Sequence, residues 1–536
     1  MKRLFLLLAF AATMFVGCSD SYDDSAIWKE LGKLEQEQEK MQEQIDAQQK
    51  LLEALTKQLA IISITPTEDG YEILFSDNST ITVNYGQDND SLFTDIAVSE
   101  DSVTFILTDG TVVVVPLAGN NNGGNSGDSV ENNKIYYTTS DNTKLFPITD
   151  ASLYGAILIS NTYKDGQGVL TFDDDITLIG GGAFSGCTTL ATITIPESVT
   201  TIGGSAFSWC EGLTSVTIPD SVTTIGGSAF SGCTGELVVN CNIPSVSSSS
   251  SGPFYGSKFT SITIGDSVTS IGDYAFYGCD ECESITIGRS VTTINNAFRY
   301  FDVYSNLKRV DINDLSAWCK IDFTGWDSNP LDVCEADLYL CGEKLRDLVI
   351  PSDITIVKTD TFQGCNSIES VTIPDNVTTI EEGAFRYCLG LTSAVIGNGI
   401  TSINKETFRG CSNLTTVSIP NSVVSIGYDA FSGCGLIEVT IPDSVERIGT
   451  YAFLSCTRLK TVIIGSGVTS IGDQAFNSIN GVLNAIYCKP IIPPTIGDAI
   501  TARYSITVYV PEDSEDVYKT SAGWSNYAYS IVGYDF

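Results

Sequence analysis

Phenylalanine recurs at a nearly fixed interval from residue 184 onward, in most cases with a cysteine three residues later. The pairs are Phe184/Cys187, Phe207/Cys210, Phe230/Cys233, Phe276/Cys279, Phe362/Cys365, Phe385/Cys388, Phe408/Cys411, Phe431/Cys434 and Phe453/Cys456. Neighbouring pairs lie mostly 23 residues apart, and Phe230 and Phe276 lie 46 apart, which is two periods. A fixed period of this length is typical of a solenoid, in which each repeat packs only on its neighbours.

A single repeat shows how the chain turns within each coil. Residues 213–230 read LTSVTIPDSVTTIGGSAF. Val216 and Ile218 alternate with hydroxyl residues, as in a strand that buries one face. Pro219-Asp220-Ser221 predicts a turn, and a second short apolar segment follows. Because one coil has no means of covering its own apolar side, the coils must stack, and the sequence predicts a mainly β solenoid with short helical turns.

The repeat pattern L-x-x-[VI]-x-I-P-x-S-V-x-x-I-G-x-x-A-F-x-x-C resembles the BspA-like leucine-rich repeat family over residues 135–536. The resemblance implies a capped repeat domain on a bacterial surface protein of Bacteroidetes type, with a role in adhesion rather than catalysis. The expected domains are a signal peptide (1–17), a lipidated acidic tether (18–25), a coiled coil (26–62), a small β module (63–119), a flexible linker (120–134), an N-terminal cap (135–175), repeats (176–488, with an irregular insert at 299–361) and a C-terminal cap (489–536).

The first residues have the pattern of a secretion signal. Lys2 and Arg3 precede a short apolar run, which ends at Gly17 and Cys18. This end resembles the bacterial lipobox, which implies lipidation of Cys18. The acidic segment that follows resembles those that direct Bacteroidetes lipoproteins to the outer surface. We therefore expect a protein anchored in the outer membrane by lipid alone and exposed at the cell surface, although the sequence leaves open which side it faces.

Residues 27–62 carry apolar side chains at alternating steps of three and four, with a polar exterior. This spacing predicts a coiled coil and hence a parallel homo-oligomer, because all chains are tethered at the same end. Dimer and trimer both remain open, as does a single amphipathic helix packed on its own β module. That module is expected to contain two hairpins, over residues 71–85 and 102–117. Residues 18–119 resemble a coiled-coil-plus-hairpin domain of many Bacteroides surface lipoproteins.

The charge of the chain narrows the choice of function. Asp and Glu number 65 against 28 Lys and Arg, so the formal net charge is −37, and histidine is absent. The acidic excess argues against nucleic acid as a partner, and the lack of histidine removes the commonest general base and metal ligand. We expect no cofactor, no metal and no enzyme activity, and a macromolecular ligand such as a host matrix protein, mucin or a neighbouring cell surface. A glycan-capture protein, a carboxylate-only hydrolase and a purely architectural protein remain alternatives.

Candidate ligand-binding residues come from two features of the repeats. Hydroxyl residues alternate with the buried residues of the predicted strands, at Thr192, Thr194, Ser215, Thr217, Ser261, Thr263, Ser284, Thr286, Ser370, Thr372, Thr416 and Ser418. We expect them to line one sheet as a weakly charged surface, or simply to keep the strands soluble. Trp318 and Trp326 in the insert are candidates for sugar or peptide contacts, although Trp318 lies in an element that recurs in the family and there suggests packing.

Cysteine and serine raise two further questions of chemistry. Of 16 cysteines, 15 remain if Cys18 is acylated, and this odd number rules out complete intramolecular pairing. We expect mostly free thiols that pack as small apolar groups, with some bridges between neighbouring coils as the alternative. Asp-Ser followed by a small apolar residue resembles the O-glycosylation sequence of Bacteroidetes envelope proteins, which makes Ser25, Ser102 and Ser129 candidate acceptors.

Overall fold

A computed structural model of the protein divides the chain into two compact units, Met1–Ser129 and Val130–Phe536. It describes the backbone of residues 61–66, 70–75, 80–84, 93–98, 102–107 and 112–116 in the first unit. In the second it describes residues 131–536, except 149, 300–305, 326, 335, 479–481 and 498–505. The predicted signal peptide and nearly all of the predicted coiled coil lie outside these residues.

The described part of the first unit consists of two three-stranded antiparallel sheets. One has the order β1 (Ile61–Pro66), β2 (Gly70–Phe75), β3 (Thr80–Asn84), and the other β4 (Phe93–Val98), β5 (Ser102–Leu107), β6 (Val112–Pro116). Each predicted hairpin is present, and each gains one further strand before it in the chain. Ile61 and Ile62 lie in β1, whereas we predicted them as the end of the coiled coil. Their β-branched side chains favour the strand.

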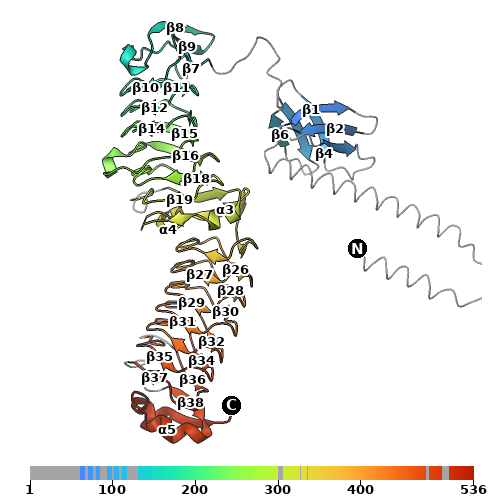
Figure 1. Ribbon diagram of the computed structural model, residues 1–536, viewed down its shortest axis with the longest axis vertical. Helices are drawn as coiled ribbons and strands as arrows, with labels where there is room; N and C mark the ends of the chain where they lie inside the picture. The colour runs from blue at the N-terminus through green and yellow to red at the C-terminus, as the bar shows by residue number, and fades with distance from the viewer. Residues whose placement is uncertain are drawn as a thin grey trace, which may run out of the picture. The chain divides into compact units, whose positions relative to one another are not determined.

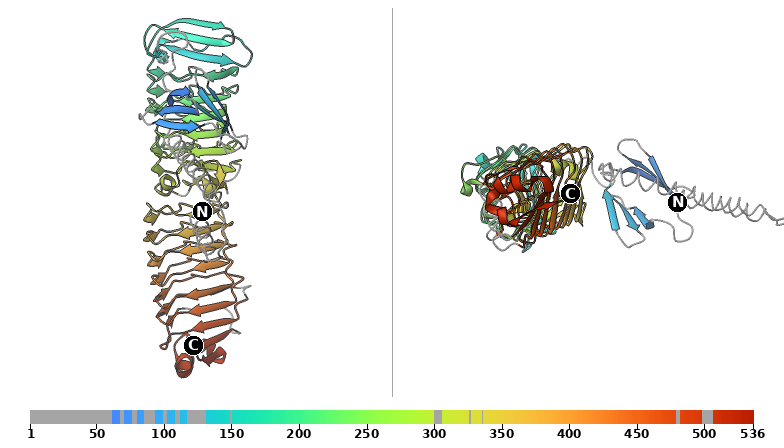
Figure 2. Two further views of the ribbon diagram at one scale, coloured as in Figure 1. Left: turned by 90° about the vertical axis from the view of Figure 1, so that its right-hand side faces the viewer. Right: turned by 90° about the horizontal axis from the view of Figure 1, so that it is seen from below.

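The second unit is the predicted solenoid, and its coils stack along one direction from β8 to α5 (Figures 1 and 2). Each regular coil contains a long strand, a turn, a short strand and a further turn that carries the phenylalanine. The long strands are β11 (Leu190–Ile193), β13 (Ser215–Ile218), β15 (Thr234–Val239), β16 (Lys258–Ile264), β18 (Ser284–Ile287), β20 (Arg309–Ile312), β22 (Asp337–Leu340), β24 (Asp347–Val349), β26 (Ser370–Ile373), β28 (Ser393–Ile396), β30 (Thr416–Ser418), β32 (Glu438–Ile441), β34 (Thr461–Ile464) and β36 (Ala485–Cys488). The short strands are β10 (Leu178–Ile179), β12 (Thr201–Ile202), β14 (Thr224–Ile225), β17 (Ser270–Ile271), β19 (Thr293–Ile294), β21 (Asp322–Phe323), β25 (Ile356–Val357), β27 (Thr379–Ile380), β29 (Ser402–Ile403), β31 (Ser425–Ile426), β33 (Arg447–Ile448), β35 (Ser470–Ile471) and β37 (Thr495–Ile496).

Parallel pairing keeps equivalent residues of neighbouring coils side by side. Ser261 pairs with Ser284 and Thr263 with Thr286, one coil apart. The inward residues between them, such as Ile262 and Ile285, are at most 1% exposed. Close stacking also requires glycine in the second turn, because a β-carbon on Gly226 would lie 2.3 Å from the backbone nitrogen of Gly204.

The phenylalanines form two buried columns of stacked rings. Phe184, Phe207, Phe230, Phe254, Phe276 and Phe298 follow one another at centroid distances of 5.0 to 5.6 Å. Phe362, Phe385, Phe408, Phe431, Phe453 and Phe476 do the same at 5.2 to 5.5 Å. None is more than 2% exposed. Burial of these rings is the main apolar contribution of the turn to stability.

Two hydrogen-bond ladders join successive coils outside the strands. The cysteine thiol donates to the phenylalanine carbonyl of the preceding coil, for example Cys210 Sγ to Phe184 O at 3.1 Å. The serine of the Pro-Asp-Ser turn donates to a carbonyl of the preceding coil, for example Ser221 Oγ to Val199 O at 2.9 Å. Both residue types therefore have a structural role that the repeat position explains.

Both ends of the stack are covered, as the cap prediction requires. At the N-terminal end β7 (Lys134–Thr139), β9 (Gln167–Phe172) and β8 (Leu158–Lys164) continue the sheet of long strands in antiparallel order, with the short 3-10 helix η1 (Ala151–Leu153). At the C-terminal end lie β38 (Thr507–Pro511), η3 (Glu512–Ser514), α5 (Glu515–Thr520), η4 (Trp524–Ser530) and β39 (Ile531–Tyr534). Trp524 is fully buried there, and its indole N–H donates to Pro494 O at 2.8 Å.

Residues 306–361 join the two phenylalanine columns. They contain α3 (Leu315–Cys319), α4 (Pro330–Cys334) and the hairpin strand β23 (Glu343–Lys344). The short 3-10 helix η2 (Ser249–Ser251) lies outside this region, in an earlier coil. This region is more regular than the predicted insert, because β20 and β22 keep the parallel register of the long strands. Its irregular part is the pair of helices, which lies between β19 and β27 along the stack (Figure 1).

Candidate ligand-binding surface

The outward residues of the long strands form the surface that the alternating pattern predicted. Thr194, Ser215, Thr217, Thr372, Thr416 and Ser418 are exposed, whereas Thr192, Ser261, Thr263, Ser284, Thr286 and Ser370 are half-buried. The strand pattern is the cause, because residues at even spacing share a face and the alternate residues fill the core. We call these twelve residues the hydroxyl face.

The hydroxyl face is not continuous along one sheet, contrary to our expectation. The long strands belong to an 11-stranded sheet that ends at β23, a four-stranded sheet from β24 to β30, and a five-stranded sheet from β32 to β39. Ser370 and Thr372 therefore lie in a different sheet from Ser261 and Thr263. Val238 also interrupts the row, since it pairs with Thr217 on one side and Thr263 on the other.

Charged and aromatic groups mark the end of the first sheet. Arg309 forms a bidentate ion pair with Asp311, at 2.5 and 2.7 Å, and its guanidinium lies 3.9 Å from the ring centroid of Tyr339. Bonding to Asp311 raises the pKa of Arg309 above its ordinary value. The hydroxyl surface thus divides into an N-terminal part, from β11 to β18, and a part beyond β24.

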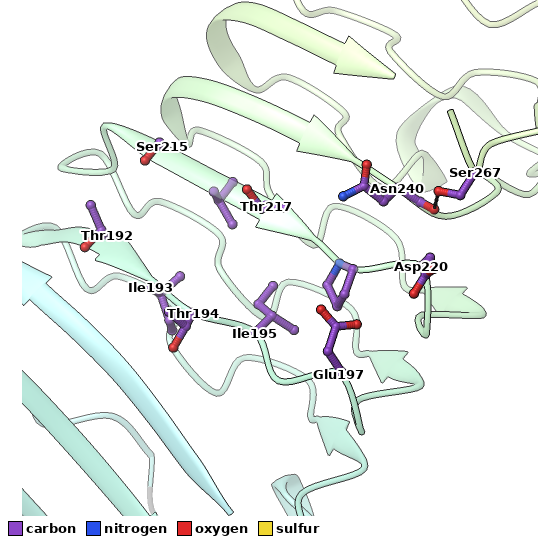
Figure 3. A pocket seen from close by; sticks show the side chains of 12 residues that line it. Thr192, Ile193, Thr194, Ile195, Glu197, Ser215, Thr217, Asp220, Asn240 and Ser267 are labelled. Carbon is purple, nitrogen blue, oxygen red and sulfur yellow. Dashed lines mark hydrogen bonds between the residues drawn. The ribbon is translucent and has the colours of Figure 1, made fainter. Parts of the chain in front are cut away.

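An open groove of about 600 Å³ lies over the N-terminal part of the hydroxyl face (Figure 3). Thr192, Thr194, Ser215 and Thr217 line it along β11 and β13. Its far end is lined by Glu197, Asp220, Asn240 and Ser267, which come from the turns after the long strands. The sequence predicted the hydroxyls, whereas the inclusion of Glu197 and Asn240 depends on how the turns of four coils align.

The two carboxylates in the groove differ from the equivalent carboxylates of other coils. Asp375 Oδ1 accepts the N–H of Asn398 at 2.6 Å, and Asp443 Oδ1 accepts the N–H of Ser466 at 2.7 Å. Among the described residues, no hydrogen bond or ion pair engages the carboxylate of Glu197 or Asp220, and both side chains are exposed. Their acceptor capacity is therefore available to a ligand.

The tryptophans of the insert do not form a described binding site. Trp318 is 1% exposed, packs on Phe323, and donates its indole N–H to Thr361 O at 3.1 Å. We therefore correct our assignment of Trp318 as a ligand-binding candidate, because a ring that is buried and fully bonded has no free surface for a ligand. Trp326 lies outside the described residues.

Several other predicted positions also fall outside the described part of the chain. These are Cys18, Ser25 and Ser129. Ser102 begins strand β5, of which only the backbone is described. No group of three or more Asp, Glu or Cys side chains suited to a metal ion occurs among the described residues. Likewise, no helix in the described part of the chain is long and apolar enough to cross a membrane.

The cysteines whose side chains the structure describes are free thiols, in agreement with our expectation for most of them. Eight of the nine repeat cysteines are buried, and Cys187 at the N-terminal end is half-buried. Burial raises the pKa of Cys279 and of Cys456 to about 12, so these thiols stay protonated at neutral pH. The buried thiols pack inside the stack as structural groups, and among the cysteines whose side chains the structure describes only Cys341 is exposed.

Comparison with known proteins agrees with this architecture. Six copies of the BspA-type leucine-rich repeat region match residues 168–251, 235–320, 336–453 and 378–492, which together make up more than half of the chain. No curated protein matches it.

Solved structures with similarity to the chain include three from bacteria. A leucine-rich repeat protein from Bacteroides ovatus is 29% identical and covers 61% of this chain and 85% of its own, with a TM-score of 0.38. A leucine-rich repeat protein from T. pallidum is 32% identical and covers 27% of this chain and 72% of its own, with a TM-score of 0.25. A leucine-rich cell surface protein from Faecalibacterium prausnitzii is 22% identical and covers 73% of this chain and 94% of its own, with a TM-score of 0.31. On the extent of the repeat match, the chain belongs to the BspA-type leucine-rich repeat family.

Proposed function

We propose that this protein is a non-catalytic surface lipoprotein whose solenoid binds a macromolecular ligand, such as a host matrix protein, mucin or another cell surface. The observation that carries the proposal is the groove over β11 and β13, where hydroxyls lie beside the free carboxylates of Glu197 and Asp220. An open and weakly charged sheet face offers many small contacts, which suits an extended ligand better than a small molecule. The net charge of −37 favours ligands with a basic segment.

The proposal is tested by a binding panel of matrix proteins, mucins and whole cells, probed with the full-length protein in detergent micelles. We expect the double substitution Ser215→Lys/Thr217→Lys to weaken binding about tenfold or more. The two long cationic side chains would block the hydroxyl face and repel the basic segment of a ligand. Thr224→Lys is the matched control, since Thr224 is also exposed but lies on the short strand β14 of the same coil. A panel with no ligand, or equal losses in the control, would contradict the proposal.

A further inference from the structure

Two exposed aromatic residues occupy a backbone position that the repeat otherwise gives mainly to glycine. This position follows the column phenylalanine by two residues and has a positive φ in most coils. Glycine fills it at Gly186, Gly232, Gly256, Gly278, Gly364, Gly410 and Gly433, with φ between 62° and 75°. In the described part of the repeats, the exceptions with positive φ are Trp209 (φ 62°), Tyr387 (φ 58°) and Ser455 (φ 59°).

A large side chain is disfavoured in this left-handed conformation, whereas glycine adopts it without steric cost. The left-handed conformation occurs at two positions of this repeat. The second position lies two residues before the phenylalanine. That second position holds small or polar residues such as Ser205 and Glu406, and also the half-buried tyrosines Tyr274 (φ 59°) and Tyr451 (φ 60°). Trp209 and Tyr387 differ from these residues because their rings are 55% and 43% exposed. Strained positions that hold exposed side chains often belong to ligand contacts.

Each ring lies along the surface over the glycine of the next coil. A β-carbon on Gly232 would lie 2.9 Å from Cε3 of Trp209, and one on Gly410 would lie 2.3 Å from Cδ1 of Tyr387. The glycine therefore makes room for the ring at both places. Trp209 lies between β12 and β13, and Tyr387 between β27 and β28, so both rings are on the phenylalanine turn. Among the described residues, the same arrangement thus occurs once beside each phenylalanine column.

The polar groups of both rings are unused. Among the described residues, nothing accepts a hydrogen bond from the indole N–H of Trp209, and nothing bonds to the hydroxyl of Tyr387. The buried rings of the protein differ in this respect, because Trp318 and Trp524 both donate to a main-chain carbonyl. Each exposed ring therefore presents apolar surface together with one free polar group, although at Tyr387 the guanidinium of Arg386 lies over the ring, 5.9 Å from its centroid.

We propose that Trp209 and Tyr387 are stacking platforms for a neutral glycan chain, at a site separate from the hydroxyl face. A sugar ring has an apolar face of C–H groups, which packs on an aromatic face, and hydroxyls that bond to the indole N–H or the phenol. The charge of −37 disfavours anionic glycans. A ligand made of repeated units can engage both platforms, so that two weak contacts reinforce each other.

The variants Trp209→Gly and Tyr387→Gly test this proposal without threatening the fold. Each installs the residue that most other coils carry at the same backbone angle, so we expect the thermal midpoint to stay level or rise. Tyr529→Ala is the matched control, because the ring of Tyr529 is fully exposed in η4 but sits outside the phenylalanine turn.

The probes are four neutral polysaccharides, namely amylopectin, laminarin, galactomannan and xyloglucan, with heparin as the anionic counterpart. The measurement is affinity electrophoresis of the full-length protein in detergent micelles. We expect at least one neutral polysaccharide to retard the protein, heparin to have no effect, and each glycine variant to weaken the interaction about tenfold.

Three outcomes would overturn the proposal: no neutral polysaccharide binds, the two glycine variants together change the affinity less than twofold, or Tyr529→Ala causes the same loss. The Ser215→Lys/Thr217→Lys variant separates the two sites and should leave glycan binding unchanged. If this variant abolishes glycan binding and the glycine variants do not, the assignment of the platforms is wrong, whereas the assignment of the hydroxyl face as a binding surface is supported. If the glycine variants lose only a protein ligand, the assignment to glycans is wrong.

Discussion

Phenylalanine, cysteine and turn serine each make the same contact in successive coils. Phe408 stacks between Phe385 and Phe431, and the thiol of Cys434 donates to Phe408 O at 3.1 Å. Ser422 likewise donates to Ile400 O at 2.7 Å. Because every such contact joins neighbouring coils, the stability of the solenoid is close to a sum of nearest-neighbour contributions.

Charged side chains form a partly buried network beside the second phenylalanine column. Arg386 donates to Glu406 at 2.8 Å and lies 3.6 Å from Asp360. Arg409 reaches Glu406 at 3.1 Å and Asp429 at 3.3 Å. Burial raises the pKa of Asp360 to about 6, although Arg386 opposes this shift.

Asp360→Asn should therefore change how stability depends on pH. The ordinary pKa of Asp360 is 3.8, so between about pH 4 and 6 the folded state holds a proton that the unfolded chain has released. Stability falls as pH rises through this window, and the neutral variant lacks this loss. We expect the difference in thermal midpoint, variant minus wild type, to become more positive from pH 3 to pH 7. Asparagine also suits the left-handed φ of 56° at this position.

Asp443→Asn gives a control of opposite sign. The N–H of Ser466 bonds to the Asp443 carboxylate and lowers its pKa below the ordinary value. The stabilisation by this carboxylate is present above pH 4 and is lost as pH falls through the folded-state pKa, so the midpoint difference should become more negative toward pH 7. Parallel curves for the two variants would contradict the assigned shifts.

The sequence did not identify one ring of the first phenylalanine column, that of Phe254. The spacing from Phe230 to Phe276 indicated a missing coil but did not identify its ring, which the structure shows to be Phe254. The signal was present, because Phe254 lies 24 residues after Phe230, but the Ala-Phe-x-x-Cys pattern is replaced by Pro-Phe-Tyr-Gly-Ser. Ser257 there takes the place of cysteine and lies 3.2 Å from Cys279 Sγ.

At the scale of elements, α3 and α4 connect the two phenylalanine columns. The Trp318 indole donates to Thr361 O at 3.1 Å, and the Asn329 side-chain amide donates to Asp360 O at 2.7 Å. Both acceptors lie just before Phe362, the first ring of the second column. The Trp318 bond satisfies Thr361 O, whose counterpart in regular coils accepts the phenylalanine N–H of the preceding coil, as Ala206 O accepts from Phe184.

Trp318→Phe should destabilise the protein by about 1–3 kcal/mol, because it removes a buried hydrogen bond and leaves a small cavity. Trp209→Phe makes the same chemical change on the surface and should stay within about 0.5 kcal/mol of wild type. Denaturant unfolding of both variants measures the difference. Equal effects would show that the indole bond does not hold the two columns together.

On the scale of the whole molecule, the repeats and their caps form one unit, and residues 1–129 form another. Caps are necessary because an open end of the stack would expose apolar side chains and unpaired strand edges. Surface display of this unit through Cys18 remains our proposal. It is supported by the basic start, the short apolar run and the lipobox-like residues before the cysteine.

Cys18→Ser should release the protein from the membrane, because lipid is the only anchor that the proposal includes. In fractionated cells of an expressing bacterium, we expect the wild-type protein in the membrane pellet and the variant in the soluble fraction. Cys341→Ser is the control, since Cys341 is an exposed thiol of the solenoid. Retention of the Cys18 variant in the pellet would contradict lipid anchoring.

The sequence alone determined the solenoid, its inward phenylalanines and cysteines, and its outward hydroxyls. A coil that repeats every 23 residues has only one way to hide its apolar side, so periodicity is sufficient for these features. The tertiary structure decided which outward residues meet. The break into three sheets, the burial of Trp318 and the rings of Trp209 and Tyr387 over glycine all depend on contacts between coils, and such contacts leave no periodic trace in the sequence.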